Sequence, residues 1–90
     1  MDLDDEELNA TRKLNGVKET ADEMFEKLGY YKDFDDIVYG YRKEEGGDFF
    51  EIDFWLEDKE VSKNYYREAG NITMQELKAI NKKVEELGWI

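Results

Sequence analysis

Apolar and polar residues alternate along Asp48–Glu57, which predicts a β-strand at the centre of the fold. Four apolar residues occupy alternate positions: Phe50, Ile52, Phe54 and Leu56. The positions between them hold two aromatic residues and two carboxylates: Phe49, Glu51, Asp53 and Trp55. Successive side chains of a strand point to opposite faces of its sheet. The first set therefore predicts a core face, and the second predicts an unusual mixed face.

Weaker alternation predicts two further strands, Ile37–Arg42 and Val61–Tyr66, on either side of the central one. Glu44–Asp48 contains two adjacent glycines that suit a hairpin turn, and Glu57–Glu60 forms a second short turn. Strands joined by tight connections are neighbours, so the three form an antiparallel meander. Gly40 interrupts the first strand, and a glycine there often marks close approach by another group. Two segments are expected to be loops: Tyr31–Asp36 and Arg67–Asn71.

Helical spacing of apolar residues predicts a first helix over Val17–Leu28. Its stripe consists of Val17, Ala21, Met24, Phe25 and Leu28. Thr20 and Glu23 also match a capping box, which would start the helix at Ala21, although the stripe favours a start near Val17. After the helix, Gly29 suits a left-handed conformation, and Tyr30 can pack back on Phe25.

A second helix is predicted over Thr73–Leu87, with Thr73 and Glu76 as its capping box. Its expected buried stripe is Leu77, Ile80, Val84 and Leu87. Ile72 and Leu77 are placed to form a hydrophobic staple, Gly88 ends the helix, and Trp89 can cover Val84.

These elements predict an α+β fold, a two-layer sandwich in which an α-β-β-β-α chain packs its three-stranded antiparallel meander on two helices. The helices cover the core face, and no predicted element remains for the other face. We expect residues 17–90 to form a single domain. Residues 1–16 contain an acidic run from Asp2 to Glu7, and we predict that they form an acidic arm or a short helix.

The charge balance restricts the partners, because 24 acidic and 13 basic residues give a net charge of −11. Such a chain repels nucleic-acid phosphates and anionic membranes, whereas basic proteins are attracted to it. The sequence has no cysteine and no histidine, so it lacks disulfides, thiolate zinc sites and the commonest general base. We expect no cofactor and no metal site, and we expect a cytoplasmic protein.

Two segments resemble the ends of small uncharacterised proteins encoded by phages and prophages of Gram-positive bacteria. These segments are Thr20–Tyr30 and Ile72–Trp89, which both end in leucine, glycine and an aromatic residue. The resemblance covers the helices well, the strands loosely, and residues 1–16 not at all. It implies a phage or prophage origin in a bacterial host cell and supports the domain limits, but it assigns no activity and no site residue.

The mixed face is the one candidate site. It consists of Phe49, Glu51, Asp53, Trp55, Arg42 and Tyr66. One interpretation is a binding face on which aromatic residues supply contact area and carboxylates recognise basic groups. The other is a solvated sheet face, where aromatic cross-strand pairs add about 0.2–1 kcal/mol each. Large exposed apolar residues favour the first interpretation.

Three functional hypotheses follow. The first is a non-enzymatic phage or prophage protein that acts by protein–protein interaction, through the mixed face or a free strand edge, including as a homodimer. The second is an acidic mimic of nucleic acid that inhibits a basic host protein. The third, an enzyme, is not expected, because Glu51 and Asp53 lie on one strand without a concave site and no nucleophile is paired with a base.

Overall fold

The computed structural model describes residues 19–66 and 68–90 and has an α+β fold, as the sequence predicts. The predicted arm over residues 1–16 lies outside the described residues, as does Val17. Two helices and five strands follow one another as α1 (Ala21–Lys27), β2 (Tyr31–Phe34), β3 (Val38–Glu45), β4 (Asp48–Trp55), β5 (Glu60–Tyr65), β6 (Glu68–Ala69) and α2 (Met74–Glu86).

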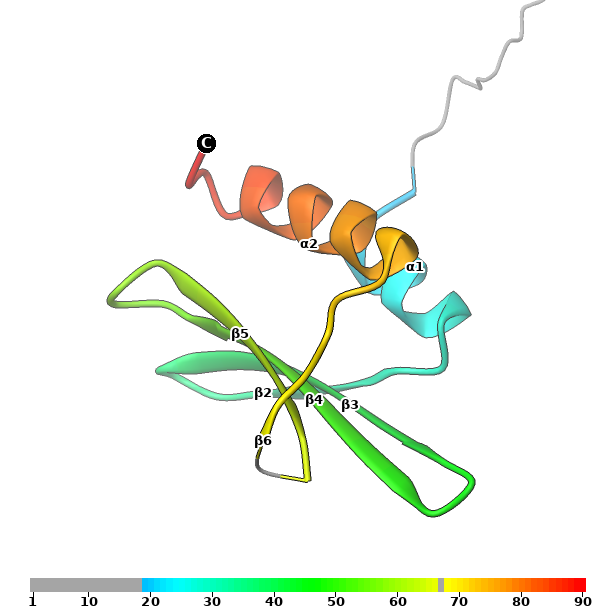
Figure 1. The fold of residues 1–90 in the computed structure, drawn as a ribbon. Coiled ribbons are helices and arrows are strands. Elements are labelled where there is room, and N and C mark those ends of the chain that lie inside the picture. Colours follow the sequence, from blue (N-terminus) through cyan, green and yellow to red (C-terminus); the bar gives the residue numbers. More distant parts are fainter. Residues whose placement is uncertain (1–18, 67) are drawn as a thin grey trace, which may run out of the picture.

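The strands form one antiparallel sheet in the order β2-β3-β4-β5-β6, so every strand pairs with its neighbour in the chain. Both helices lie side by side on the same side of this sheet (Figure 1). The backbone N–H of Ala21 donates a 2.8 Å hydrogen bond to the Glu86 carboxylate, which ties the start of α1 to the end of α2. The two-layer arrangement predicted from the sequence is therefore present.

The predicted antiparallel meander is present as β3, β4 and β5, but the predicted number of three strands is wrong, because the sheet has five. Tyr31–Phe34, predicted as a loop, forms β2 because the Asp35 carboxylate accepts hydrogen bonds from the N–H groups of Ile37 and Val38, both at 2.9 Å. This side chain closes a tight turn that folds β2 back along β3. At the other end, Glu68–Ala69 forms the short strand β6 after a turn at Tyr66.

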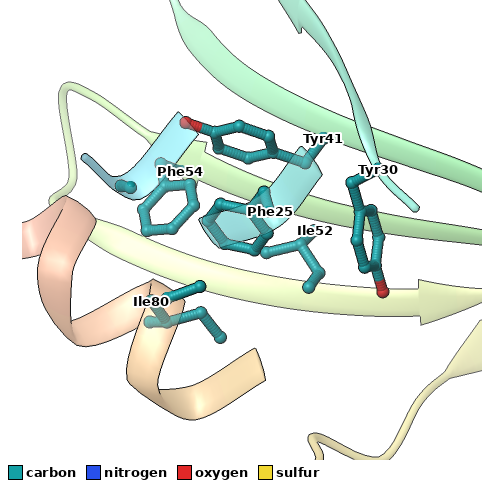
Figure 2. Close-up of a cluster of buried hydrophobic side chains, with 8 residues drawn as sticks. Phe25, Tyr30, Tyr41, Ile52, Phe54 and Ile80 are labelled. Carbon is teal, nitrogen blue, oxygen red and sulfur yellow. The ribbon is translucent and has the colours of Figure 1, made fainter. Parts of the chain in front are cut away.

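The core lies between the helices and the sheet and is built largely from aromatic rings (Figure 2). Phe25 of α1 stacks on Tyr41 of β3 with ring centroids 3.9 Å apart, and the rings of Tyr30 and Phe54 meet it edge-on. Ile52 and Phe54 are fully buried, which confirms the predicted core face of the central strand. Burial of each large apolar side chain contributes about 1.5–3 kcal/mol.

Both predicted capping boxes are present. The Thr20 hydroxyl accepts from the Glu23 N–H, so α1 begins at Ala21 and not near Val17. Gly29 and Gly88 adopt φ angles of 95° and 76°, which place the predicted left-handed residue after each helix. These local signals define the helix ends well.

The face of α2 that packs on the core confirms the predicted stripe at Ile80, Val84 and Leu87, but not at Leu77. Its buried residues are Glu76, Ala79, Ile80 and Lys83. Leu77 is 40% exposed, and its predicted staple partner Ile72 is also exposed. Glu76 and Lys83 are buried beside these residues because each has charged or aromatic partners beneath the helix, as described below. Neither helix in the described part of the chain is long and apolar enough to cross a membrane.

Candidate functional site

The far face is the side of the sheet opposite the two helices (Figure 1). The strand register places most of the predicted site there. Its ionisable residues are Asp33, Arg42, Glu44, Glu51, Asp53 and Glu60. Five carboxylates and one guanidinium give this face a formal charge of −4. Within residues 19–66 and 68–90, no helix or strand covers it.

Arg42 lies at the centre of the far face. Its Nη1 atom is 2.8 Å from Oδ1 of Asp53, and its Nε atom is 3.4 Å from Glu51 and 3.5 Å from Asp33. Gly40 leaves room for the Arg42 guanidinium, because a Cβ atom on residue 40 would lie only 2.4 Å from Nη1 of Arg42. The glycine thus marks the close approach that the sequence indicated. The structure brings Arg42, Glu51 and Asp53 together as one ion-pair cluster.

The aromatic residues of the candidate site lie apart from one another. Trp55 is at one end of β4, where its indole N–H donates to Ser62 Oγ at 3.0 Å and its side chain is 39% exposed. Phe49 is six residues away, near the β3–β4 hairpin, which corresponds to about 20 Å along a strand. Tyr66 follows β5 and donates its backbone N–H to Phe49, so it belongs to the Phe49 end. The far face therefore has an acidic centre with aromatic residues at both ends.

A buried polar network on the opposite, helix-covered face was missed by the sequence analysis. The Glu76 carboxylate accepts hydrogen bonds from Lys63 Nζ and from the Tyr30 hydroxyl, both at 2.7 Å, and from the Thr73 N–H at 3.0 Å. The Lys63 and Glu76 side chains are 6% and 4% exposed. Burial alone would raise the pKa of Glu76, but the hydrogen bonds from Lys63, Thr73 and Tyr30 outweigh it and lower the pKa.

A second buried cation, Lys83, also lies between α2 and the sheet. Its Nζ atom is 4.9 Å from the Phe34 ring centroid and 5.0 Å from that of Tyr39, within cation–π range. Asp22 Oδ1 lies 3.8 Å away and accepts a 2.6 Å hydrogen bond from the Tyr41 hydroxyl. Burial raises the pKa of Tyr41, and this hydrogen bond raises it further.

These two networks join the helices to the sheet, so their role is architectural. One sequence signal could have revealed the first network. Lys63 alternates with Val61 and Tyr65 on the core face of its strand, where an ammonium group requires a buried partner. Glu76 stands at the capping-box position of the following helix and supplies that partner.

A hollow of about 320 Å³ lies between α1 and the edge strand β2. It is lined by Asp22, Glu23, Glu26, Tyr30, Tyr31, Lys32 and Tyr41. Three carboxylates and three tyrosines face a single lysine, so the lining suits a cation. Among the described residues, no group of three or more carboxylates is arranged to hold a metal ion.

Comparison with protein-family models, with curated proteins and with solved structures found no significant match. The functional conclusion therefore depends on the geometry and chemistry of the chain itself.

Proposed function

We propose that this protein is a non-enzymatic interaction module that binds a basic protein through its far face. The phage or prophage origin implied by the helix ends belongs to this proposal. The single observation that carries it is the acidic centre of the far face, flanked by aromatic residues, on a sheet that has both described helices, α1 and α2, on its other side.

The composition of the far face supports a protein partner. Trp55 and Tyr31 are 39% and 55% exposed there, and aromatic side chains provide much of the binding energy of protein interfaces. A solvated sheet face with no partner would more commonly carry small polar residues and charges of both signs. The rigid pairing of β4 on both sides also gives a partner a preorganised surface.

The charge of the far face supports a basic partner. Arg42 neutralises part of the cluster at the centre, but four negative charges remain in excess on this face. Lys and Arg side chains of a partner would restore the balance, and the net charge of −11 would accelerate the encounter. Such binding weakens as salt increases, whereas association driven by apolar contacts does not.

The test is a pull-down from bacterial host lysate with matched variants. Trp55→Ala and Glu51→Lys alter the far face, and Met74→Ala removes an exposed side chain of α2 as the control. We expect the two far-face variants to lose a basic partner that wild type and the Met74→Ala control both retain. Equal capture by all four folded proteins would exclude the far face as the contact.

Mimicry of nucleic acid is a second candidate, favoured by the five carboxylates on one face. In this case the basic partner would be a nucleic-acid-binding protein, and duplex DNA would displace the module from it. Displacement with a steep salt dependence would support mimicry. Arg42 pairs with three of the five carboxylates and interrupts the row of negative charges that would imitate phosphates, which counts against mimicry.

A homodimer through the far face is the remaining alternative, and solution mass distinguishes it. Two copies would bring two faces of the same negative charge together, so their association should strengthen at high salt. Multi-angle light scattering at low and high salt measures this directly. A dimer that forms only at high salt would favour self-association over a basic partner.

A further inference from the structure

We propose that the open edge of β2, together with the acidic hollow beside it, binds an extended basic segment of another protein as an added β-strand. This surface differs from the far face, because it uses the backbone edge of the sheet and the side of α1, although Tyr31 borders both. The inference therefore goes beyond the proposed function.

The backbone of β2 has hydrogen-bonding groups available for an additional strand. β2 is the first strand in the sheet order, and all four of its residues are exposed. The Asp35 N–H donates a 2.9 Å hydrogen bond to the Val38 carbonyl, in line with the β2–β3 register. In an antiparallel pair every second residue bonds to the partner strand, so Asp33 and Tyr31 are the residues of β2 that bond to β3. The N–H and C=O groups of Lys32 and Phe34 consequently point toward the open edge.

The hollow provides a place for one side chain of such a segment. It adjoins Tyr31 and Lys32 at the start of β2 and has a volume of about 320 Å³. Peptides that extend a sheet gain affinity from main-chain bonds and specificity from pockets that accept alternate side chains. The aromatic walls suit a long aliphatic stem, and the carboxylates suit the charge at its end.

Glu26 is the carboxylate best placed to receive a new cation. Asp22 already accepts from Tyr41 and lies 3.5 Å from Lys32, and Glu23 accepts the Thr20 N–H of the capping box. Glu26 makes no ion pair with any residue in 19–66 or 68–90 and is exposed. A lysine or arginine from the segment would pair with this carboxylate.

A second copy of this chain fits the edge poorly. In a two-fold antiparallel pairing, residues that face each other directly must point to the same side of the sheet. For the four residues of β2, the two-fold axis then passes beside Lys32 or beside Asp33. In the first case Lys32 lies opposite Lys32 of the second copy, and in the second case Asp33 lies opposite Asp33. Like charges directly opposite one another are destabilising. This argument favours a different protein with basic residues.

The experiment uses an array of nine-residue peptides in which Val alternates with Lys, Arg, Glu or Thr. The full chain is applied, and the strongest binder is then titrated in solution while the backbone amides are followed by NMR. We expect Lys or Arg peptides to bind and Glu and Thr peptides not to bind. The amide resonances of Lys32 and Phe34 should shift, and N-methylation of alternate peptide amides should abolish binding.

Glu26→Lys and Glu57→Lys provide the matched pair of variants, because both residues are exposed and only the first lines the hollow. We expect Glu26→Lys to weaken the peptide about tenfold or more. Glu57→Lys, in the β4–β5 turn, should change affinity less than about twofold. Equal weakening by both variants would overturn the proposal, because it would indicate general attraction to an acidic protein. Failure of every peptide to bind, or shifts confined to β5, would also overturn it.

Discussion

Replacement of Glu76 by glutamine tests how the helix layer is attached to the sheet. The carboxylate accepts hydrogen bonds from Lys63 and Tyr30 at 2.7 Å and from the Thr73 N–H at 3.0 Å. Glutamine preserves the size of the side chain but replaces one oxygen with an amide nitrogen, which cannot accept. Whether the remaining oxygen faces Lys63 or Tyr30, the Lys63 ammonium would keep only neutral acceptors, such as the Asn71 carbonyl at 2.7 Å, and would stay buried without a counter-charge.

Removal of one partner of a buried ion pair costs about 3–5 kcal/mol, because the other charge remains desolvated. A domain of this kind has about 5–15 kcal/mol of stability in total. We therefore expect Glu76→Gln to lose a large part of the free energy of unfolding. Lys63→Met together with Glu76→Gln removes both charges, and the glutamine oxygen can still accept from Tyr30. The double variant should recover to within about 2 kcal/mol of wild type.

Urea unfolding followed by tryptophan fluorescence measures these differences, since Trp89 lies 6.3 Å from Phe54 in the core. Glu57→Gln, at an exposed carboxylate, is the control and should leave the unfolding free energy unchanged. A loss below about 1 kcal/mol for Glu76→Gln would refute the reasoning, because the pair would then be hydrated. A double variant no more stable than Glu76→Gln would refute it as well.

The same network gives a pH dependence with a definite sign. The pKa of Glu76 is lowered in the folded protein from its ordinary value of 4.5, so the unfolded chain binds a proton first as pH falls. The stabilisation is complete above pH 4.5 and is lost as pH falls through the folded-state pKa. Wild type should lose more stability than Glu76→Gln over this range, while relief of acidic repulsion affects both proteins alike.

Three further predictions concern the far face, the core and a helix cap. Gly40→Ala should force the Arg42 guanidinium away from Asp53 and cost about 1–3 kcal/mol in urea unfolding, and the effect should nearly vanish in an Arg42→Met background. Burial and a hydrogen bond raise the pKa of Tyr41 above its ordinary value of 10.0, so its stabilisation is lost as pH rises above 10, and Tyr41→Phe should flatten alkaline unfolding curves. Thr20→Ala should cost about 1 kcal/mol in thermal or urea unfolding, because the seven-residue helix α1 depends on its capping box.

The sequence predicts the parts of the fold that local patterns determine. Alternation along Asp48–Glu57 identified β4 and its core face, and the capping boxes at Thr20 and Thr73 identified where both helices start. The glycines after the helices marked their ends correctly. Each of these signals depends on residues within a few positions of one another. They are therefore visible without knowledge of the tertiary structure.

The two outer strands were missed because little in their own sequence favours a strand. β2 has only four residues, and it forms because the Asp35 side chain closes the following turn. β6 has two residues and depends on Tyr66, whose φ angle of 51° is unusual for a residue other than glycine. Elements of this length are stabilised by the neighbouring strand, which a local pattern does not reveal.

The burial of two charged residues of α2 was missed for a different reason. A rule that buries leucine and exposes charge chose Leu77, whereas the structure buries Glu76 and Lys83. Their partners come from distant elements: Lys63 on β5 for the first, and Asp22 on α1 for the second. Only pairing across the core makes the burial of these charges favourable. The proximity of Arg42 to Glu51 and Asp53 could be predicted from strand alternation, whereas Asp33 was missed because β2 was predicted as a loop.

The placement of cations has a consequence for both proposed surfaces. Within residues 19–66 and 68–90, the basic side chains of Arg42, Lys63 and Lys83 are each at most 14% exposed and lie beside a carboxylate. If each is counted with one acidic partner, 21 acidic and 10 basic residues remain. The net charge is unchanged, but the remaining surface has fewer cations for each carboxylate than the composition suggests. A partner therefore has to supply the basic groups itself. Reversal of charge at Glu51 or at Glu26 should separate contacts at the far face from contacts at the β2 edge.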